Sequence, residues 1–579
     1  MVSTTDLVVA SGAAAAEVVQ VVDGRPGQRT RVPADDLPRW VGEREAPRAT
    51  SPVRWVWADS GDVYAGLLGR GVRVRRAVDL RLTRAVLRRA AAVADTPYAR
   101  SPATPWDDSP AADLTHPRPG TTPDDAAPML DATLFAPPGG SSPTAPDVDA
   151  CVAEHLAQLG CLDRAQDGGR LALLCHAESV GGLIAQELNQ VGVPFSVETH
   201  DRLLAGLLGE RPSGGARPAV LAALCEEVRA ALDAPALNPD SHPDLVTSLR
   251  RVGLDVRSTR QWELQKLDHP AIPPLLAYRK LSRLHSANGW AWMDAWVRDG
   301  RFRPDWVAGA VVTGRWASRG GGALQLPKQV RGSVRADPGW RLVVADAAQL
   351  EPRVLAAMSG DDRMAAAASR GDLYSALVEQ GVVETRQHAK VAMLGAMYGA
   401  TSGEAGALMP RLQRAYPRAI ELVESAARAG ERGQRVSTWL GRTSPEPASW
   451  WRAAQSAAQE PGAGRSVEHQ ARQAARDWGR FTRNFVVQGT AAEWALCWMG
   501  HLRRLLEDRF GGTPGGGSRP ELVYFLHDEV MVHTPQEYAL DVAELVREAG
   551  RAAGELLFGA FPVQFPLDVV VVRSYDKAT

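Results

Sequence analysis

The hydrophobic pattern divides the chain into blocks of strands and blocks of helices. Short apolar runs and turns fill residues 1–94, which end in the helical stretch LRLTRAVLRRAAAVA. Residues from 149 to about 300 have the spacing of amphipathic helices, and a second helical block fills 350–510. Strand-like runs precede that block in WVAGAVVTGRW and WRLVVADAAQL, and they return at 521–533 and 563–573. The pattern predicts a sheet whose strands come from both sides of a long helical insertion.

Residues 95–148 differ from their neighbours. The segment is dense in Pro, Asp, Ser and Ala, and such a composition buries too little apolar surface to order itself. We therefore expect a mostly disordered linker. Within it, LDATLFAP is a short apolar element of the kind that folds onto a groove, with simple packing onto a neighbouring domain as the alternative.

Composition narrows the classes of protein. The net charge is −1, so there is no global positive field, although a local basic groove is enough to bind nucleic acid. The five cysteines are odd in number and form no CxxC pair, which argues against a disulfide framework or a zinc site and fits a reducing cytoplasm. We expect no membrane span, because no run of about 18 apolar residues appears, and a first strand rather than a signal peptide at the N-terminus.

Two acidic residues lie at the ends of predicted strands. Asp346 follows the apolar run 342–345, and a helical pattern begins directly after it. Asp528 lies in the bend HDE between the strand-like runs 522–526 and 530–532. The alternatives are a helix N-cap for Asp346 and an ordinary acidic turn residue for Asp528.

A stripe of mixed chemistry lies on the helix predicted in TRQHAKVAMLGAMYGATSG. Arg386, Lys390, Leu394 and Tyr398 recur at steps of four, which places them on one helical face. Two cations followed by an aliphatic and an aromatic side chain suit a triphosphate with a base attached. The alternative is a solvated basic face with Tyr398 in the core.

Together these features meet the needs of two-metal phosphoryl transfer. Two hard divalent cations need oxygen ligands, and at about 4 Å apart they clamp the attacking and leaving oxygens. Positive side chains neutralise the departing pyrophosphate. Asp346 and Asp528 would supply the oxygens, and the basic half of the stripe would supply the positive charge.

The sequence resembles the family-A DNA polymerases, the bacterial DNA polymerase I group, in the type labelled bifunctional 3′-5′ exonuclease/DNA polymerase. DAAQLEPR resembles motif A, RQHAKVAMLGAMYG motif B and HDE motif C. Supporting matches lie in order around these motifs, in TGRWASRGGGALQLP, TWLGRT, RFTRNFVVQGTAAEWA and FPLDVVVVRSYDKAT. The resemblance covers about 170–579 and is carried by the joint order and spacing of these motifs.

The resemblance implies roles for residues of this chain. Two Mg²⁺ ions, with Mn²⁺ as a substitute, would be held by Asp346, Asp528 and the Ala347 carbonyl, with Glu529 in support and Lys390 as a further catalytic residue. The implied nucleotide-binding residues are Arg386, Lys390, Tyr398, Glu351, Gln349, Leu394, Tyr374 and Lys328. The implied DNA-binding residues are Arg315, Gln325, Arg480, Asn484, Gln488 and His527.

Several positions depart from the family pattern. Ala347 and Ala348 stand where the family has Tyr-Ser, and Leu394 replaces an aromatic residue. Tyr374 stands in place of a phosphate-contacting His, and the loop after LQLP is short, so Lys328 would have to replace a phosphate-binding Arg. The expected metal site is therefore intact and the expected nucleotide pocket altered.

The first domain resembles the family's proofreading exonuclease in one segment, RWVWADSGDVYAGLLGRGVRVRRAVDLRLTRAVL. Asp62 and Asp79 lie in plausible places, and Asp147 is the candidate for a remnant of the last motif. The first strand lacks the Asp-x-Glu pair that such a nuclease needs to hold its metals. The expectation is an exonuclease fold without proofreading.

The expected architecture is a multidomain α/β protein with a right-hand polymerase, namely an antiparallel palm sheet with helical fingers and thumb, after a small α/β exonuclease-like domain. The expected divisions are a degenerate exonuclease-like domain at 1–94, a linker at 95–148, thumb and connecting helices at 149–300, palm at 301–350, fingers at 351–478 and palm again at 479–579.

The expected function is template-directed DNA synthesis in repair or gap filling, in the cytoplasm with the nucleoid. Expected partners are primer-template DNA and deoxynucleoside triphosphates, with the chain as a monomer and with LDATLFAP faintly resembling sliding-clamp motifs through Leu134 and Phe135. One alternative is a catalytically weak polymerase fold that acts as a DNA-binding scaffold. A single-subunit RNA polymerase is a second alternative, and Glu351 argues against it.

Overall fold

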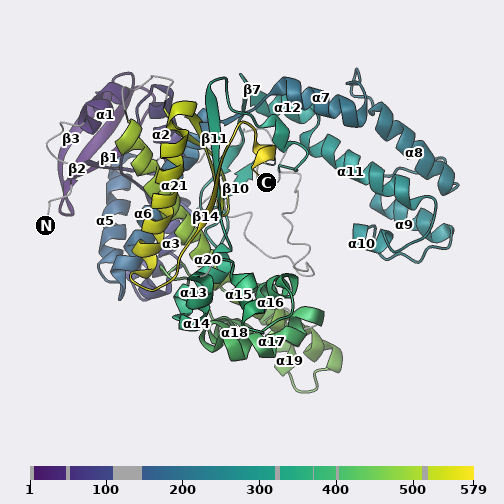
Figure 1. Ribbon diagram of the computed structural model, residues 1–579. Coiled ribbons are helices and arrows are strands. Elements are labelled where there is room, and N and C mark those ends of the chain that lie inside the picture. The colour runs from purple at the N-terminus through teal and green to yellow at the C-terminus, as the bar shows by residue number, and fades with distance from the viewer. Residues whose placement is uncertain are drawn as a thin grey trace.

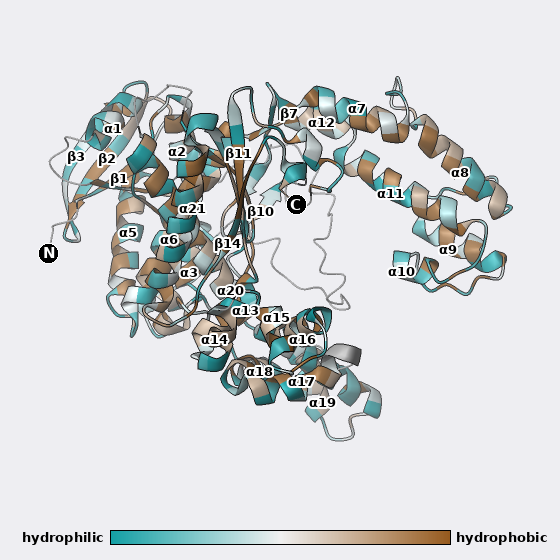
Figure 2. Ribbon diagram, in the orientation of Figure 1, coloured by the Kyte–Doolittle hydropathy of each residue, from teal (hydrophilic) through white to brown (hydrophobic). Residues whose placement is uncertain are grey.

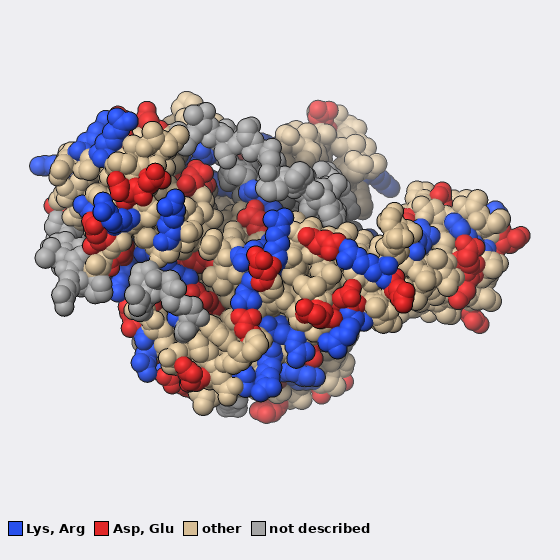
Figure 3. Space-filling model, turned by 90° about the horizontal axis from the view of Figure 1, so that it is seen from above, with Lys and Arg blue, Asp and Glu red and all other residues tan. Residues whose placement is uncertain are grey.

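The computed structural model describes residues 5–46, 53–107, 146–319, 322, 326–369, 371–399, 403–511 and 519–578. Figure 1 shows a central sheet with an α/β unit on one side and two helical arms, one formed by α7–α11 and the other by α14–α19. Among the described residues, no helix has the length and apolar character needed to span a membrane. Figure 3 shows acidic and basic side chains interspersed over the visible face, in keeping with a net charge near zero.

The N-terminal unit is a five-stranded sheet with helices packed against it, which confirms the predicted small α/β domain. The strand order is β3-β2-β1-β4-β5, and β4 pairs in parallel with both β1 and β5. The single first strand expected near the N-terminus is instead an antiparallel pair, β1 and β2. The bounds are β1 Thr5–Ser11, β2 Ala15–Val22, β3 Arg25–Pro33, β4 Val53–Trp57, β5 Ala77–Asp79, α1 Leu37–Glu45, α2 Ser60–Gly69 and α3 Leu80–Leu87.

The segment expected to be a linker starts with folded structure, so that prediction was wrong for residues 95–107. Helix α4 (Pro97–Arg100) and a 3-10 turn (Pro105–Asp107) are fixed by polar contacts. The buried Arg84 guanidinium pairs with Asp107 at 2.8 Å, and the Tyr98 hydroxyl donates to Glu154. Sequence composition alone did not reveal these partners. The hypothesised docking residues Leu134 and Phe135 lie outside the described residues.

Two long helices join the N-terminal unit to the rest of the molecule. Helix α5 (Val148–Leu162) packs on β1 and α3, and α6 (Gly168–Val191) packs on α2, α3, β5, β12 and α20. The arm beyond them consists of α7 Val197–Leu208, α8 Ala219–Ala231, α9 His242–Arg251, α10 Gln261–Leu264, α11 Ile272–Asn288 and α12 Trp290–Trp296. Helices α5 and α6 therefore belong to the body of the molecule, and the arm begins at α7 (Figure 1).

The central sheet confirms the prediction that strands from both sides of the helical insertion pair. Its order is β12-β13-β11-β14, and every neighbouring pair is antiparallel. The strands are β11 Trp340–Ala347, β12 Glu521–Leu526, β13 Glu529–Pro535 and β14 Leu567–Val572. Helices α20 (Arg465–Phe510) and α21 (Ala539–Phe558) pack on each other, and α21 packs on β11, β13 and β14. The centre of the sheet is strongly hydrophobic in Figure 2.

The stretch WVAGAVVTGRW does not form the single strand that its pattern predicted. Short strands β9 (Asp305–Val307) and β10 (Ala317–Arg319) pair with each other, and residues 308–316 form the loop between them. Gly309 and Gly314 have φ of +62° and +85°, values that oppose an extended strand. A separate small sheet has the order β6-β8-β7, with bounds β6 Val193–Pro194, β7 Val297–Arg298 and β8 Arg301–Phe302.

The helical insertion between β11 and β12 has its own hydrophobic core. Met393, Leu412 and Tyr416 are buried in it, and α16 packs on α15, α17 and α20. The bounds are α13 Leu350–Ser359, α14 Asp362–Ser369, α15 Leu373–Glu379, α16 Arg386–Tyr398, α17 Gly403–Ala415, α18 Pro417–Glu431 and α19 Ser449–Gln459.

A buried polar seam binds the N-terminal unit to the central body. Arg503 of α20 donates to Glu187 of α6 at 2.7 Å and to the Val74 carbonyl at 2.6 Å, and the Tyr64 hydroxyl donates to Glu187 at 2.6 Å. Arg73 joins Glu187 at 3.4 Å. Burial would raise the pKa of Glu187, but the two guanidinium groups outweigh it and lower that pKa to about 2. The seam thus holds a fully ionised carboxylate in the interior.

Candidate active site

The pairing of β11 with β13 brings the two predicted acidic residues together. Asp346 lies opposite Glu529 in the register of the two strands, one residue from Asp528. The Ala347 N–H donates to the Asp528 carbonyl at 2.8 Å, which continues the ladder into the hairpin bend. Gln349, rather than Asp346, is the N-cap residue of α13, so the N-cap alternative for Asp346 is wrong.

A residue with left-handed backbone lies within three positions of each of the two carboxylates. Gln349 at the start of α13 and His527 before Asp528 both have φ of +55°. Non-glycine residues adopt this conformation at a free-energy cost, and such residues cluster at functional sites. Here the conformation lets β11 pass directly into α13 and lets the hairpin turn at His527 and Asp528.

The two carboxylates repel each other in partly dehydrated surroundings. Burial, followed by the charge of Asp346, raises the pKa of Asp528 to about 7. Burial also raises the pKa of Asp346, together with the charge of Asp568, which lies opposite it on β14. A divalent cation would relieve this repulsion, and carboxylate and carbonyl oxygens are the ligands that Mg²⁺ prefers.

The donor set would suit Mg²⁺, which Asp346, Asp528 and the Ala347 carbonyl could hold. Over the described part of the chain, no group of three or more His, Cys, Asp or Glu side chains is arranged to hold a metal by itself. Glu529 is buried, and its carboxylate accepts a hydrogen bond from Tyr575 at 2.9 Å. This hydrogen bond holds the Glu529 carboxylate in position next to Asp346 and Asp528.

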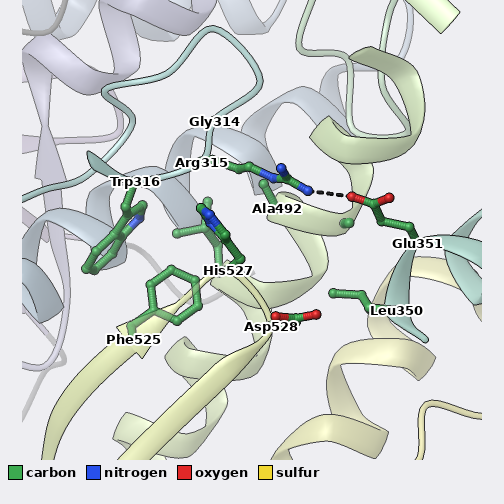
Figure 4. Close-up of a pocket in the computed structure, with 11 residues that line it drawn as sticks. Gly314, Arg315, Trp316, Leu350, Glu351, Ala492, Phe525, His527 and Asp528 are labelled. Atoms are coloured by element: carbon green, nitrogen blue, oxygen red, sulfur yellow. Dashed lines mark hydrogen bonds and ion pairs between the residues drawn. The ribbon is translucent and has the colours of Figure 1, made fainter. Parts of the chain in front are cut away.

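A cavity lies between the hairpin bend and α20. Figure 4 shows Arg315 reaching toward Glu351 across it, with His527 and Asp528 contributed by the hairpin. Loss of water around the His527 ring, followed by the charge of Arg315, lowers the pKa of that imidazole to about 4, so His527 is neutral at pH 7. Ala491, Ala492 and other small or apolar side chains form the wall.

A chain of polar contacts connects four predicted site residues from four segments. Arg315 forms an ion pair with Glu351, and the Tyr398 hydroxyl donates to Glu351 at 3.1 Å. The Gln488 side-chain amide then donates to the Tyr398 hydroxyl at 3.2 Å. The loop between β9 and β10, helix α13, helix α16 and helix α20 are thereby linked at one place.

Helix α16 presents the predicted stripe, with its polar end exposed and its apolar end half-buried. Lys390 is exposed and forms no ion pair with any described residue. Leu394 and Tyr398 are half-buried, so Tyr398 is not a core residue. Arg386 donates to Asp372 at 2.6 Å and lies 5.6 Å from the centre of the Tyr374 ring.

Asp372 organises the start of α15 and was not identified from the sequence. Its carboxylate accepts hydrogen bonds from Arg386, from the Gln349 side chain and from the Tyr374 N–H. Burial would raise its pKa, but these donors outweigh it and lower the pKa of Asp372 to about 2. Its place before a helix in GDLY was the available sequence signal for an N-cap.

Helix α20 aligns three of the predicted DNA-binding residues at steps of four. Arg480 pairs with Asp477, Asn484 follows one turn later, and Gln488 reaches Tyr398. The Asn484 side-chain oxygen is buried without a hydrogen-bond partner in the described part of the chain. The same face continues to Ala492, which lines the cavity. Lys328 is exposed, and Gln325 lies outside the described residues.

Of the three acidic residues singled out near the N-terminal unit, two cap helices and one is exposed. Asp79 is buried and caps α3 by accepting from the Leu82 N–H at 3.0 Å, and it also accepts from the Ser60 hydroxyl at 2.8 Å. Asp62 is exposed in the first turn of α2. Asp147, the candidate remnant, is the N-cap of α5.

Comparison with known proteins gives a family and a fold. Residues 226–576, more than half of the chain, match the model of DNA polymerase family A. DNA polymerase I of Chloroflexus aurantiacus is 26% identical over 406 residues, 64% of this chain and 37% of that protein. The thermostable DNA polymerase I of Thermus aquaticus is 27% identical over 431 residues, 69% of this chain and 44% of that protein. The chain spans less than half the length of these relatives.

A solved structure has a similar fold over the whole chain. The POL domain of Pol1 from M. smegmatis, in complex with DNA primer-template and dNTP, aligns with a TM-score of 0.63 over 100% of this chain and 96% of that chain. The sequence identity is 19%, so this likeness concerns the fold. It confirms the predicted polymerase architecture.

The raised pKa of Asp528 gives a prediction for stability in the absence of DNA. Because the folded pKa lies above the ordinary value, this carboxyl stabilises the fold at low pH and loses that contribution as pH rises through about 7. We expect Mg²⁺ to raise Tm by roughly 1–3 °C at pH 8 and by less at pH 6. Differential scanning fluorimetry with and without Mg²⁺ measures this.

Two variants provide the comparison for this prediction. In Asp528→Asn the Mg²⁺-dependent rise should disappear, whereas the exposed Asp255→Asn should behave as wild type. An equal Mg²⁺ increment in Asp528→Asn and wild type would contradict the assignment of the metal site.

Proposed function

Because this chain belongs to DNA polymerase family A, we propose that it is a template-directed DNA polymerase that adds deoxynucleotides to a primer 3′ end. The observation that carries the proposal is the Asp346–Asp528 pair beside a cavity whose lining residue Glu351 accepts a hydrogen bond from Tyr398, at the end of the α16 stripe. Carboxylates for metal and cations for a triphosphate are the two requirements of nucleotidyl transfer. The supporting comparison is the match to the family over the segment that contains all of these residues.

Asp346, Asp528 and the Ala347 carbonyl would hold two Mg²⁺ ions, with Glu529 in support. When bound, these ions supply charge stabilisation for the phosphate oxygens during transfer. Lys390, exposed on α16, would contact the triphosphate directly. Arg386 would have to exchange its hydrogen bond with Asp372 for one with a phosphate, because its guanidinium is engaged in this structure.

The remaining assigned residues would position the reactants. Leu394 and Tyr398 would lie beside the nascent base pair, and Glu351 would crowd the sugar 2′ position. Gln349, Tyr374 and Lys328 would contribute to nucleotide binding. The neutral His527 would touch the primer end. Arg315, Gln325, Arg480, Asn484 and Gln488 would line the primer-template duplex, mainly through its backbone.

We further propose the domain roles stated above: residues 149–300 contain the thumb and connecting helices, 351–478 the fingers, and 301–350 with 479–579 the palm. Gap filling or repair in the cytoplasm, with the nucleoid and as a monomer, remains the proposed setting. The interaction of Leu134 and Phe135 with a sliding clamp stays a prediction. The second candidate function is a DNA-binding scaffold with weak catalysis, which the replacements at Leu394, Ala347 and Ala348 favour.

Removal of either site carboxylate distinguishes a working polymerase from a DNA-binding scaffold. Asp346→Ala or Asp528→Ala should reduce primer extension to below about 1% of wild type, because a single lost group at the reacting centre commonly costs two to three decades. DNA affinity should change little, since phosphate contacts spread over many residues hold the duplex. Primer-extension gels and fluorescence anisotropy measure the two quantities.

Asp541→Ala is the matched control and should extend primers normally, because Asp541 is an exposed carboxylate at the start of α21 that pairs with Arg509 of α20. Substantial extension by Asp346→Ala would reject the assigned site. DNA binding without extension by the wild type would favour the scaffold.

We also propose that the N-terminal unit has no proofreading activity. Asp79 is occupied as a helix cap, and β1 carries no Asp-x-Glu pair. A mismatched, end-labelled primer incubated with Mg²⁺ and no nucleotides should remain undegraded at its 3′ end. Metal-dependent trimming that is lost in Asp62→Ala would show that the unit is a working nuclease.

The last prediction here concerns sugar selection by Glu351. Its carboxylate lies between Arg315 and Tyr398, where it would oppose a 2′-hydroxyl on an incoming nucleotide. Deoxynucleotides should be preferred, and Glu351→Ala should raise relative ribonucleotide insertion by about 10–100-fold. Leu394→Phe should lower ribonucleotide insertion by a smaller factor, because the larger side chain adds steric bulk beside the sugar but no charge.

Single-nucleotide insertion kinetics with a matched deoxy/ribo pair measure the ratio. An unchanged ratio in Glu351→Ala would mean that Glu351 does not select the sugar.

A further inference from the structure

A buried ion pair lies behind the loop that carries Arg315. Glu178 of α6 accepts a hydrogen bond from the Arg442 guanidinium, and the two side chains are 2% and 11% exposed. Arg442 follows the tight turn 438–441, in which the Thr438 N–H donates to the Arg442 carbonyl at 2.9 Å. The pair joins a helix of the body to the segment after α18, far from it in the sequence.

A second buried carboxylate anchors the same turn to α20. Glu493 accepts from the Leu440 N–H at 3.0 Å and from the Thr438 hydroxyl, and its side chain has no solvent exposure. The Trp439 N–H donates to the Thr490 hydroxyl at 3.0 Å. The turn that delivers Arg442 is therefore fixed to the helix that also carries Gln488 and the cavity wall.

The loop 308–316 lies directly on this ion pair. A Cβ atom on Gly309 would be 2.8 Å from the Glu178 Oε2 atom, and one on Gly314 would be 2.7 Å from the Arg442 Nε atom. Both glycines also have left-handed φ values that side chains disfavour. No larger residue fits at either position without moving the charged side chains. Glycine at these two positions therefore lets the backbone contact the pair.

Gly314, which lies against Arg442, directly precedes Arg315, so the position of the ion pair affects the position of Arg315. Inside the loop, the Gly314 N–H donates to the Val311 carbonyl at 2.7 Å, and the Val311 N–H donates to the Arg315 carbonyl at 3.1 Å. Arg315 then extends across the cavity to Glu351 (Figure 4). The Arg442 Nε atom has no hydrogen-bond partner in the described part of the chain, so one donor of the guanidinium is left unused beneath Gly314.

We propose that the Arg442–Glu178 pair is a positioning device for Arg315, and through Arg315 for Glu351. Gly309 contacts Glu178 and Gly314 contacts Arg442. The positions of these two charged side chains therefore determine where the loop lies relative to the cavity. The kinetic consequence rests on the proposed polymerase function, whereas the contact itself can be tested without substrate. Arg442 and Glu178 do not reach the cavity, so they are positioning residues.

The first test measures the loop alone by hydrogen–deuterium exchange. Glu178→Gln keeps the shape of the side chain but leaves Arg442 without its counter-charge. The amides of Val311 and Gly314 should then exchange about 10-fold faster or more, because their protection depends on the closed loop. Asp6→Asn is the matched control: it neutralises another buried carboxylate, paired with Arg54 at 2.8 Å in the N-terminal sheet, and should leave these two amides unchanged.

The second test is a double-mutant cycle in nucleotide insertion. Glu178→Gln should lower kcat by about 10-fold with little change in the KM for nucleotide, since a small misplacement of a positioning group can cost up to two decades. In an Arg315→Ala background the same change should cause no further loss, because the group that it positions is gone. Independent, multiplying losses would overturn the inference.

Glu178→Asp keeps the charge and shortens the reach, so it should restore most of the lost kcat and most of the amide protection. If Glu178→Gln does not fold by circular dichroism, Gly309→Ala carries the test, because its Cβ atom would lie 2.8 Å from the Glu178 Oε2 atom. Exchange and kcat both equal to wild type in Gly309→Ala would then overturn the inference. If the wild type extends primers and Glu178→Gln changes neither amide exchange nor kcat, this inference is contradicted and the proposed function is not. Wild-type protein that extends no primer contradicts the proposed function, and the exchange experiment still decides the loop contact.

Discussion

Two carboxylates of like charge, Asp346 and Asp528, have to lie next to each other at one end of the central sheet. Repulsion would separate them in a flexible chain, but the β11–β13 ladder fixes their backbones, and the Ala347 N–H to Asp528 hydrogen bond closes the last rung. The strained backbone at His527 and Gln349 is part of the same arrangement. The cavity, the cationic helix and the polar chain from Arg315 to Gln488 are all placed relative to this pair.

The elements that carry the site were predictable because their signals are local. The apolar runs before Asp346 and on both sides of the HDE bend predicted the strands, and steps of four from Arg386 to Tyr398 predicted the helical face. All three are present in the structure. The sheet built from both sides of the insertion was also predicted, from the strand-like runs before the insertion and at 521–533 and 563–573, and it is present in the structure.

The features that escaped prediction depend on partners distant in sequence. Residues 95–107 are fixed by Arg84 and Glu154, which composition does not reveal. The loop 308–316 was predicted as a strand because most of its residues are apolar. Its glycines, Gly309 and Gly314, instead have left-handed backbone and lie against Glu178 and Arg442, which the sequence pattern does not reveal. Arg386 lies against Asp372 instead of pointing freely from its helix. Charge pairs between residues distant in sequence have no periodicity, so pattern analysis cannot find them.

The polar seam at Arg503 has a consequence for the history of the molecule. One guanidinium is shared between the Val74 carbonyl of the N-terminal unit and Glu187 of the body, and Tyr64 and Arg73 meet the same carboxylate. Removing the unit would uncover an arginine and a glutamate that are built for a dry interior, and a shortened descendant would need several simultaneous replacements along α6 and α20. A domain in this position can lose its own chemistry gradually, one residue at a time, yet cannot easily be discarded. Attachment alone would therefore keep this unit in the chain, whether or not it has an activity of its own.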